Sequence, residues 1–554
     1  MSMNGADLAV KALEANGVKV VFGYPGAANA PFIDSVSHSS IEYVLSRNEQ
    51  GAAHMASGYG RVNRVAGVCT ATSGPGATNL ITAIATAYMD SIPMVAITGQ
   101  VKRELIGKDA FQEVDITGAT LPFTKHSYLV NDVKDITRVV NEAFHIATTG
   151  RPGPVLIDFP MDVLKAPYEE DGEENEINLR GYKLLGKANE TQIKKVAQAL
   201  KKAKKPVILA GGGIALANAQ ELIRDFVKNT EIPVIATMMG LGVLPTDDPK
   251  FYGMIGSHGT KCANMMLNRS DLVIAMGTRL GDRSVANAEG LEKAKKLVHI
   301  DIDPAEIGKN MQPYIPVVGD IKDVAVQLKS ALGDYKANAE WCDEVDKLRK
   351  DTAPEISKED NGFVNPRYFL ERLSDLTKSE AYITTEVGQN QLWTANHYTI
   401  KEPNRFLTSG GFGTMGYGLP AAIGASRAQD KLPVIAVMGD GSFQMDLPEL
   451  GTMQQYDIPV KMVLFKNDRL GMVHEHQYLF YGSNYQMVDI TGGPDFAKLV
   501  DAYGIKSGRV SENSKVDDAI KAMMDGRDSY LLIVDVSPYE PTGNALNESR
   551  MKEA

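Results

Sequence analysis

The stretch Met438-Gly439-Asp440-Gly441-Ser442-Phe443 decides how this chain is expected to fold. It closes an apolar run, 434–438, of the kind that forms a buried parallel strand. A helical segment and a second apolar run, 460–465, follow, and the second run leads to Asn467. Because open α/β sheets bind ligands at the carboxyl ends of their strands, Asp440 and Asn467 are predicted to face a common ligand.

The residue types around Asp440 favour a metal-bound phosphate. A carboxylate and an amide oxygen suit Mg²⁺, which prefers oxygen ligands and completes its coordination with phosphate. The backbone N–H groups of Gly441 and Ser442 open a helix and can meet the same phosphate. The alternative is a tight strand-to-helix turn that needs glycine only for its backbone angles. The asparagine that follows the next strand favours the metal site.

This pair of motifs resembles the diphosphate-anchoring motif of thiamine-diphosphate enzymes, in which Gly-Asp-Gly is followed by Asn-Asn. Here the second half is Lys466-Asn467, which keeps only the second asparagine. The resemblance implies that Asp440, Asn467 and the backbone carbonyl of Arg469 ligate Mg²⁺. It also implies that the cofactor contacts Gly439, Gly441, Ser442 and Met472.

The composition of the 554 residues limits the class of protein. The length indicates three or four domains, and 44% hydrophobic residues are enough to fill their cores. A formal net charge of −11 argues against nucleic acid as a partner, because its phosphates would be repelled. The three cysteines lack metal-ligand spacing and predict no disulfide framework, which fits a reducing compartment. The sequence has no recognisable signal peptide and no membrane-spanning apolar stretch, so we expect a cytoplasmic protein.

Helical and strand patterns alternate along most of the chain, which predicts an α/β protein built on doubly wound parallel sheets. We expect three such domains, 1–168, 190–340 and 363–554, a number that agrees with typical domain sizes. An acidic stretch, 168–189, and a charged helical stretch, 334–358, are predicted to be solvated linkers between them.

Three N-terminal loops carry polar or small residues at predicted strand ends. Glu49 begins an almost wholly apolar helix, where it is either a cap favoured by the helix dipole or a carboxyl kept dry for chemistry. The loop 71–79 either lets backbone approach a ligand closely or is an ordinary turn. The loop 109–113, which contains Phe111 and Gln112, is a solvated loop on spacing alone.

Together with Asp90-Ser91-Ile92-Pro93 and Gly150-Arg151-Pro152-Gly153, these loops resemble acetohydroxyacid (acetolactate) synthase, and the resemblance covers nearly the whole chain. It implies that Glu49 hydrogen-bonds the aminopyrimidine of thiamine diphosphate and that Gln112 orients substrate. It also implies that Met415 is the apolar wedge that bends the cofactor. The N-terminal domain would then bind the pyrimidine and the C-terminal domain the diphosphate. Further implied cofactor contacts are Pro25, Gly26, Thr72, Gly74, Asn79, Val387, Gly388, Gln389, Asn390 and Gly413.

The central domain begins with an apolar run and the glycines Gly211, Gly212 and Gly213, which suggest a phosphate cradle without the full dinucleotide motif. The pattern Gly253-Met254-Ile255-Gly256-Ser257-His258-Gly259 resembles the FAD-binding domain of the anabolic acetohydroxyacid synthases. The resemblance implies bound FAD in a structural role, since the net ligation is redox-neutral. The residues implied to approach the flavin nucleotide are Gly211, Gly212, Gly213, His258, Arg279, Asp301 and Asp320, with Arg151 from the N-terminal domain.

The sequence departs from the family at several positions. Gly-Gly after Tyr-Pro is Gly26-Ala27 here, the residue before Glu49 is Asn48 rather than His, and Met161 replaces a Lys. His476 stands where the family has a Trp that favours 2-ketobutyrate as second substrate. His is smaller and polar, and one methylene in such a pocket is worth only about 1–3 kcal/mol, so the preference for 2-ketobutyrate is left open. His476 and Phe111 are the predicted specificity residues, and the alternative for His476 is a solvated histidine on a helix surface.

The resemblance implies an activity and its partners. Pyruvate would be decarboxylated on thiamine diphosphate, and the hydroxyethyl unit ligated to a second 2-ketoacid, giving 2-acetolactate when that acceptor is pyruvate. This is the first step of branched-chain amino acid biosynthesis. A homodimer would be the minimal active unit, a homotetramer is compatible, and a small regulatory subunit is a possible partner. The alternatives are another thiamine-diphosphate enzyme, such as a pyruvate oxidase or decarboxylase, or a non-catalytic regulatory protein on the same fold.

Overall fold

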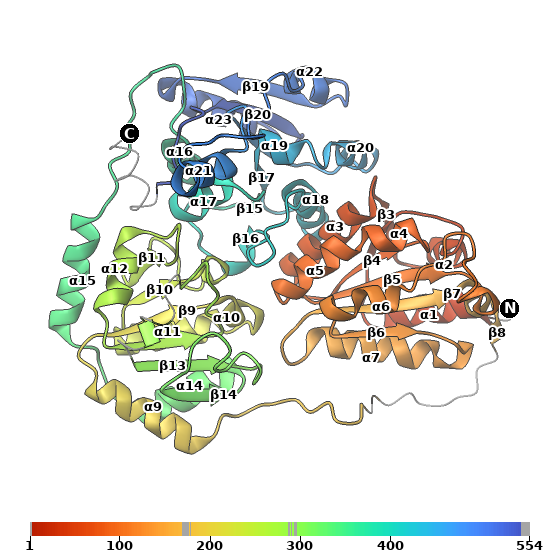
Figure 1. Cartoon of the computed structure of the whole chain (residues 1–554), viewed down its shortest axis with the longest axis horizontal. Helices are drawn as coiled ribbons and strands as arrows, with labels where there is room; N and C mark the ends of the chain where they lie inside the picture. Colours follow the sequence, from red (N-terminus) through yellow and green to blue (C-terminus); the bar gives the residue numbers. More distant parts are fainter. Residues whose placement is uncertain are drawn as a thin grey trace.

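The computed structural model describes residues 3–168, 177, 179–285, 289, 291–292 and 296–543. Figure 1 shows three lobes, each built on one sheet, with the N-terminal and C-terminal lobes in direct contact. Each of the three sheets has six strands, and every strand pairing within them is parallel. The predicted α/β fold with three parallel-sheet domains is therefore confirmed.

The N-terminal domain has the strand order β3-β2-β4-β5-β7-β6. Its central strands are mostly apolar and buried at every residue, as expected for a sheet covered on both faces. A short antiparallel pair, β1 (Met3–Asn4) with β8 (Pro167–Tyr168), joins the two ends of the domain. The other elements are β2 (Val20–Gly23), β3 (Glu42–Leu45), β4 (Gly67–Ala71), β5 (Met94–Gln100), β6 (His126–Leu129), β7 (Pro154–Pro160), α1 (Gly5–Ala15), α2 (Ala30–Ser37), α3 (Glu49–Asn63), α4 (Pro75–Asn79), α5 (Ile81–Met89), α6 (Ile116–Thr120), α7 (Ile136–Thr148) and α8 (Met161–Lys165).

The middle domain has the strand order β11-β10-β9-β12-β13-β14. The first three strands of this domain therefore form one half of the sheet and the last three form the other half, which is the strand order of dinucleotide-binding folds. Its elements are β9 (Pro206–Ala210), β10 (Val234–Ala236), β11 (Phe251–Met254), β12 (Leu272–Met276), β13 (Lys296–Asp301), β14 (Ile315–Val318), α9 (Glu190–Lys202), α10 (Gly212–Leu216), α11 (Gln220–Thr230), α12 (Lys261–Arg269), α14 (Ile321–Leu332) and α15 (Ala339–Asp351).

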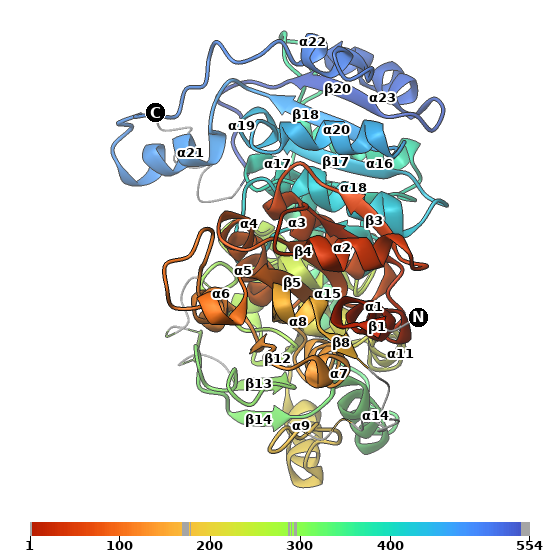
Figure 2. The same cartoon turned by 90° about the vertical axis from the view of Figure 1, so that its right-hand side faces the viewer.

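The C-terminal domain has the strand order β16-β15-β17-β18-β20-β19, which repeats the connectivity of the N-terminal sheet. In Figure 2, α21 and the loop after it project from the body of this domain. Its elements are β15 (Tyr382–Thr385), β16 (Phe406–Leu407), β17 (Val434–Gly439), β18 (Lys461–Lys466), β19 (Lys506–Val510), β20 (Tyr530–Asp535), α16 (Pro366–Leu376), α17 (Gln389–His397), α18 (Gly418–Ala428), α19 (Asp440–Phe443), α20 (Leu450–Gln455), α21 (Gly471–Phe480), α22 (Phe496–Asp501) and α23 (Val516–Met524).

The strand orders locate the ligand-binding edge of each sheet. In each sheet the strand order reverses between two neighbouring strands, which are β2 and β4, β9 and β12, or β15 and β17. Ligands of open α/β sheets bind in the crevice outside the carboxyl ends of such a pair. The loops predicted to bind cofactors follow these strands in all three domains.

The N-terminal and C-terminal domains pack together through α3 and α18, which lie side by side in Figures 1 and 2. One continuous hydrophobic core includes alanines of both helices. A Cβ at Gly58 would lie 2.1 Å from the carbonyl oxygen of Ala421, and one at Gly424 would lie 1.9 Å from that of Met55. The two glycines therefore allow a close approach of the helix backbones.

Some local expectations differ from the structure. The strand β6 was not predicted, because His126–Leu129 is an edge strand whose residues are only half-buried or exposed. The stretch 334–358 does contain a helix, α15, but it is wrong to regard it as a solvated linker. Trp341, Val345 and Leu348 on one face of α15 are buried in the core of the middle domain. The most acidic part of the stretch 168–189, 169–174, lies outside the described residues.

Two further expectations concern the chain as a whole. All three cysteines are buried and unpaired, which agrees with the absence of a disulfide framework. Within the described residues, no helix is long and apolar enough to cross a membrane.

Candidate active site

The turn after β17 is tied to the turn after β18 through Asp440. Asp440 begins α19, and its Oδ2 accepts hydrogen bonds from the backbone N–H groups of Asn467 (3.1 Å) and Asp468 (2.6 Å). Burial raises the pKa of the Asp440 carboxyl to about 6, and the two N–H donors act in the opposite direction. The two motif halves that the sequence paired are thus in direct contact.

The predicted metal ligands occupy a compact turn. Asn467 Oδ1 accepts a hydrogen bond from the backbone N–H of Arg469 (3.1 Å), and Asp468 between them has a φ of 56°. The Arg469 guanidinium points to Asp489, 2.7 Å away, and to the ring of Tyr539. Among the described residues, no group of three or more His, Cys, Asp and Glu side chains could hold a metal. One carboxylate, one amide and one carbonyl oxygen remain a fitting set for a hard cation that keeps phosphate ligands.

The loop after β15 faces the same turn. Gly388 has a φ of 137°, which favours glycine, and places Gln389 and Asn390 at the start of α17. A Cβ at Gly439 would lie 3.3 Å from Asn390 Nδ2, and the buried Asn390 Oδ1 has no hydrogen-bond partner. The unpartnered atom is an acceptor, so a donor or a cation of a ligand could satisfy it, whereas the Nδ2 beside Gly439 is the atom suited to donate to a phosphate oxygen.

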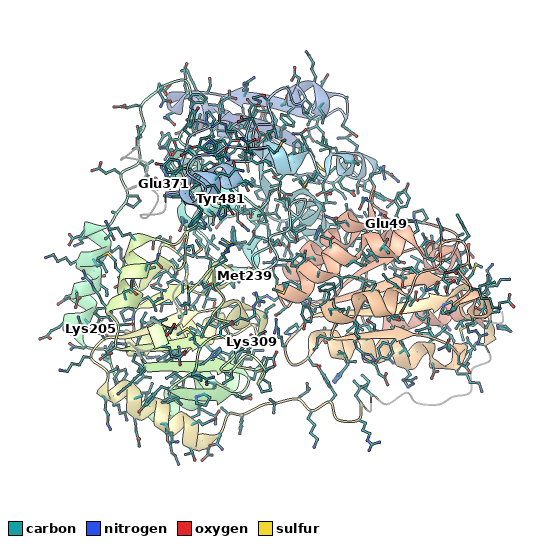
Figure 3. All side chains as sticks on the ribbon, in the orientation of Figure 1. Glu49, Lys205, Met239, Lys309, Glu371 and Tyr481 are labelled. Carbon is teal, nitrogen blue, oxygen red and sulfur yellow. The ribbon has the colours of Figure 1, made fainter. Side chains whose placement is uncertain are left out.

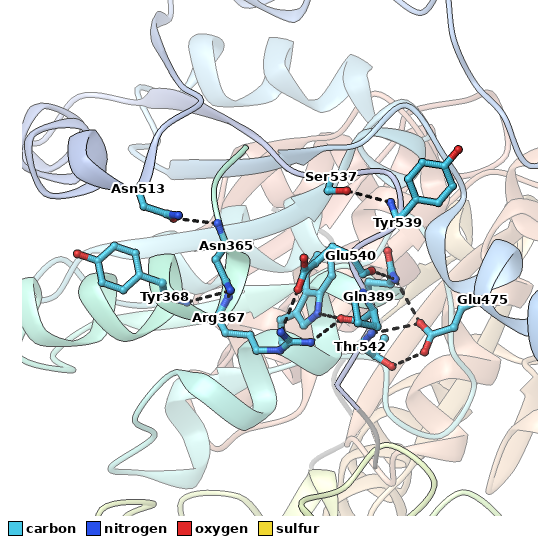
Figure 4. A network of polar contacts seen from close by, with 12 residues as sticks. Asn365, Arg367, Tyr368, Gln389, Glu475, Asn513, Ser537, Tyr539, Glu540 and Thr542 are labelled. Carbon is cyan, nitrogen blue, oxygen red and sulfur yellow. Dashed lines mark hydrogen bonds and ion pairs between the residues drawn. The ribbon is translucent and has the colours of Figure 1, made fainter. Parts of the chain in front are cut away.

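Gln389 is held by the end of the described chain (Figure 4). Its Nε2 donates to the carbonyl of Glu540 (2.8 Å) and to Glu475 (3.2 Å), while its Oε1 accepts from Asn467 Nδ2 (3.3 Å). Thr542 Oγ1 donates to Glu475 (2.8 Å). The segment near Thr542 therefore lies against the predicted diphosphate loop.

The glycine-rich stretch that carries Met415 is fixed at both ends. The Asp90 carboxylate, from the N-terminal domain, accepts from the N–H groups of Gly410 (3.1 Å) and Gly411 (2.7 Å). Glu386 accepts from Gly416 (2.8 Å) and Gly418 (2.6 Å). Burial raises the pKa of Glu386 to about 7. Half-buried Met415 is thus placed by backbone contacts on either side of it.

A second cluster of predicted residues lies in the N-terminal domain around Glu49. Glu49 is the first residue of α3, is 9% exposed, and accepts a hydrogen bond from Asn79 Nδ2 at its Oε2 (2.9 Å). A Cβ at Gly76 would lie 3.1 Å from Glu49 Oε1. The helix is capped by Asn48, whose side chain accepts from the N–H of Gln50 (2.8 Å). Asn48 and not Glu49 therefore supplies the side-chain cap, while Glu49 still lies in the first turn, where the helix dipole favours a negative charge.

The remaining N-terminal residues join this cluster. A Cβ at Gly74, where φ is 60°, would lie 2.8 Å from Gln112, and one at Gly26, which follows Pro25, would lie 2.4 Å from Thr72. Gln112 itself has a φ of 59°, and the neighbouring Phe111 side chain is 88% exposed. The loops after β2 and β4 and the loop 109–113 thus meet at the switch point of the N-terminal sheet.

A cavity of about 1840 Å³ lies between the middle and C-terminal domains, with part of the N-terminal domain. It is larger than the roughly 300–1,000 Å³ typical of single small-ligand pockets. Its lining contains Arg151, Gly212, Gly213, His258, Arg279, Asp301 and Asp320 from the predicted flavin set, and Val387, Gly388, Gly413, Met472 and His476 from the predicted active site. Two sites predicted separately therefore share one cavity.

The glycines after β9 pack against the next strand end. A Cβ at Gly211 would lie 2.2 Å from the Gly277 carbonyl oxygen, and one at Gly213 would lie 2.7 Å from Gly277 Cα. Only glycines leave room for this crossing at the middle switch point. Together with the cavity size and strand order, this cradle fits a flavin dinucleotide.

The predicted polar residues of this cavity differ in their contacts. Arg151 forms ion pairs with Glu306 (2.7 Å) and Asp303 (3.3 Å), and burial raises the pKa of Asp301 to about 6. Asp320 caps α14 by accepting from the N–H of Lys322. His476 is exposed on α21 and packs against Phe480, with ring centroids 4.8 Å apart.

The sequence did not single out the buried carboxyls that hold these loops. Glu386 stands directly before Val387, and Asp90 lies in a quoted motif, but neither spacing predicts what it binds. Asp446 and Glu449 follow Asp440 in the chain and are also buried. Burial and the neighbouring carboxyls of Glu386 and Glu449 raise the pKa of Asp446 to about 9.

Among the described residues, no hydrogen bond or ion pair joins Glu49 or Asn79 to Asp440, Asn467 or Arg469. Glu49 lies at the edge of the N-terminal domain, and Tyr481, at the end of α21, lies on another lobe (Figure 3). Met239 of the middle domain stands between the lobes in the same view, beside Gly410. The structure thus presents two half-sites on one chain.

Comparisons with known proteins identify the family of the chain. Models of the thiamine pyrophosphate enzyme N-terminal binding domain, central domain and C-terminal binding domain match residues 3–119, 193–328 and 386–534. The chain is 43% identical to the probable acetolactate synthase large subunit of Methanocaldococcus jannaschii, covering 97% of this chain and 93% of that protein. It is 41% identical to the acetolactate synthase isozyme 2 large subunit of Escherichia coli, covering 97% and 96%, and to the acetolactate synthase large subunit of Buchnera aphidicola, covering 100% and 99%. The chain belongs to the acetolactate synthase family of thiamine-diphosphate enzymes.

Proposed function

We propose that the chain catalyses the joining of two 2-ketoacids with loss of CO₂, with pyruvate as donor and pyruvate or 2-ketobutyrate as acceptor. The observation that carries the proposal is the meeting of three loops at the C-terminal switch point. Asp440 accepts a hydrogen bond from the backbone N–H of Asn467, and the side-chain Nδ2 of Asn390, a donor, lies beside Gly439. That geometry suits a metal-bound diphosphate, and the family comparison names the cofactor class.

Each half-site has a distinct task in this proposal. Asp440, Asn467 and the Arg469 carbonyl hold Mg²⁺, and Gly441, Ser442, Gln389 and Asn390 surround the diphosphate. Val387, Gly413, Met415 and Met472 give the ring system an apolar and closely fitting wall. Thiamine diphosphate supplies the electron sink for decarboxylation when bound.

The N-terminal half-site supplies acid–base chemistry and substrate contacts. Glu49, buried and oriented by Asn79, is placed to hold and exchange a proton with the aminopyrimidine of the cofactor. Gln112 and the exposed Phe111 are on the loop that would meet the acceptor ketoacid. Thr72, Gly74, Pro25 and Gly26 leave room for the pyrimidine ring.

Two half-sites on one chain are best completed by a second copy. We infer a homodimer, alone or as half of a tetramer, in which Glu49 of one chain faces the Asp440 half-site of its partner. The relatives are named large subunits, which supports a small regulatory chain as a further partner. FAD in the middle cavity would be held by the Gly211–Gly213 cradle and Arg279, and its role would be structural because the reaction is redox-neutral. A cytoplasmic location is part of the same proposal.

Product analysis tests this function directly. The purified chain, given pyruvate, thiamine diphosphate and Mg²⁺, is expected to release CO₂ and form 2-acetolactate. Glu49→Gln should lower turnover by about 10²–10⁴-fold, the usual worth of a positioned acid–base group. Acetaldehyde, acetate or acetyl phosphate as main product would assign the chain to a different thiamine-diphosphate chemistry. Absence of CO₂ release would refute an enzymatic role.

A further inference from the structure

The N-terminus of α3, where Glu49 stands, is bound by a carboxylate from the C-terminal domain. Glu449 Oε1 accepts hydrogen bonds from the backbone N–H groups of Arg47 (3.0 Å) and Asn48 (3.1 Å). Its Oε2 accepts from Thr452 Oγ1 (2.6 Å), so both oxygens are engaged. Glu449 is 1% exposed, and this contact joins positions about four hundred residues apart in the chain.

This arrangement replaces a local helix cap. In a capping box, a Glu or Gln at the third helical position reaches back to the N–H of the cap residue. The cap of α3 is Asn48 and the third position is Gly51, which has no side chain to do this. A Cβ at Gly51 would lie 2.3 Å from Glu449 Oε1. Glycine at this position therefore makes room for a carboxylate that comes from another domain.

The contact is part of a longer junction along α20. Arg47 Nη2 donates to Gln455 Oε1 (2.7 Å) and to the Gly451 carbonyl (3.2 Å). Thr452 Oγ1 lies 3.2 Å from the Leu45 carbonyl. The segment from the end of β3 to Glu49 is thus held against the C-terminal domain, while the rest of the N-terminal half-site is held within its own domain.

We propose that Glu449 is a positioning residue for Glu49: it fixes the first turn of α3 from the C-terminal domain, so that the Glu49 carboxyl meets the aminopyrimidine. The proposal rests on the proposed function, because it takes Glu49 as the group that activates the cofactor. It goes beyond that function by making the C-terminal domain of the same chain, whose own Mg²⁺ would serve the other active site of the dimer, responsible for the aim of the acid–base residue. An error of about 1 Å in such a contact can cost about 100-fold in rate.

The test measures cofactor activation and cofactor binding separately. Exchange of the C2 proton of bound thiamine diphosphate in D₂O reports on the Glu49 contact, and the cofactor concentration for half-maximal activity reports on the diphosphate half-site. Glu449→Ala is expected to slow C2 exchange and turnover about 10- to 100-fold, with cofactor affinity changed less than about threefold. Glu449→Gln keeps an acceptor for both N–H groups and is expected to remain within about threefold of the parent.

A cis replacement separates positioning from any direct role of Glu449. The double variant Gly51→Glu/Glu449→Ala places the carboxylate where a local capping box has it, and C2 exchange is expected to recover. Glu142→Ala serves as the matched control, because Glu142 is a buried carboxylate on α7 whose hydrogen bonds go to Tyr128 and Arg138. It is expected to lower the melting temperature without slowing C2 exchange.

The outcomes are distinguishable. Parent-like C2 exchange in Glu449→Ala would overturn the positioning role while the proposed function stands. A folded double variant that stays as slow as Glu449→Ala would overturn it in favour of direct chemistry by Glu449. A parent chain that forms no 2-acetolactate from pyruvate would instead refute the proposed function.

Discussion

The N-terminal and C-terminal domains have the same strand connectivity but opposite chemistry at their switch points. In the N-terminal sheet, the loops after β2 and β4 present Gly26 and Thr72, which contact each other. In the C-terminal sheet, the loops after β15 and β17 present Glu386 and Asp440, both buried carboxyls. The same strand connectivity thus offers small, uncharged loop residues suited to a ring in one domain and buried carboxyls suited to a metal-bound phosphate in the other. The difference lies in loop residues, not in the fold.

The middle domain extends this comparison. Its strands are in a different order, and its switch point is a crossing of glycines with no buried carboxyl in the contact. Where two glycine loops cross this closely, the backbone can lie along an extended ligand such as a dinucleotide. Mutations at the switch points of the three domains are therefore expected to have three different effects.

The largest expected effect is at the metal turn. Asp440→Ala should lower activity about 1,000-fold or more, equivalent to about 4 kcal/mol, because it removes a metal ligand and the acceptor for two backbone N–H groups. Thr72→Ala, at the corresponding strand end of the N-terminal domain, should cost less than about tenfold. Activity as a function of Mg²⁺ concentration checks both variants. Equal losses at the two positions would contradict the division of tasks between the domains.

The middle domain should respond through its flavin content. Gly211→Ala forces a Cβ to within 2.2 Å of the Gly277 carbonyl oxygen, so the purified protein should lose most of its flavin absorbance. Gly281→Ala is the control, since a Cβ there has nothing within 4 Å, and it should keep its flavin. Thiamine diphosphate binding by the C-terminal domain, followed by tryptophan fluorescence, should persist in both. Retention of flavin by Gly211→Ala would refute the cradle.

A smaller effect is expected at His476, on the wall that the two sites share. His476→Trp adds apolar contact in the pocket, which should raise the preference for 2-ketobutyrate over pyruvate about tenfold or more, in the range of about 1–3 kcal/mol. The ratio of the two acetohydroxyacid products under competition measures it. An unchanged ratio would assign the preference to other residues, with Phe111 the first to test.

The smallest effect concerns stability and pH. The pKa of Asp446 is raised to about 9, and that of Asp158, buried in the N-terminal domain, to about 7. Each folded state binds its proton more tightly than the unfolded state does, so stability is highest in acid and is lost as pH rises through the folded pKa. Asp158→Asn should reduce the loss of stability with rising pH only below about pH 7. Asp446→Asn should reduce this loss up to about pH 9.

Melting temperatures from pH 5 to pH 9 compare these two variants. A few degrees of relative stabilisation at pH 9 is expected for Asp446→Asn, and the additional gain between pH 7 and pH 9 should be absent from Asp158→Asn. An unchanged pH profile in Asp446→Asn would show that this carboxyl is not kept protonated by its surroundings.

The local pattern of the sequence determined a large part of this molecule. Apolar runs and the glycines after them predicted strands and cofactor loops, since buried parallel strands must be apolar and tight turns need glycine. The pairing of Asp440 with Asn467 was predictable, because both follow strands that end at one edge.

Only the tertiary structure decided the strand order of the three sheets and the partners of the buried carboxyls. Asp90 meets Gly411, and Glu449 meets Asn48, across hundreds of residues and a domain boundary. A carboxylate can satisfy any free N–H groups, so its residue type does not specify its partner. That choice comes from the packing of α3 against α18, which depends on long-range contacts between surfaces and not on any local pattern.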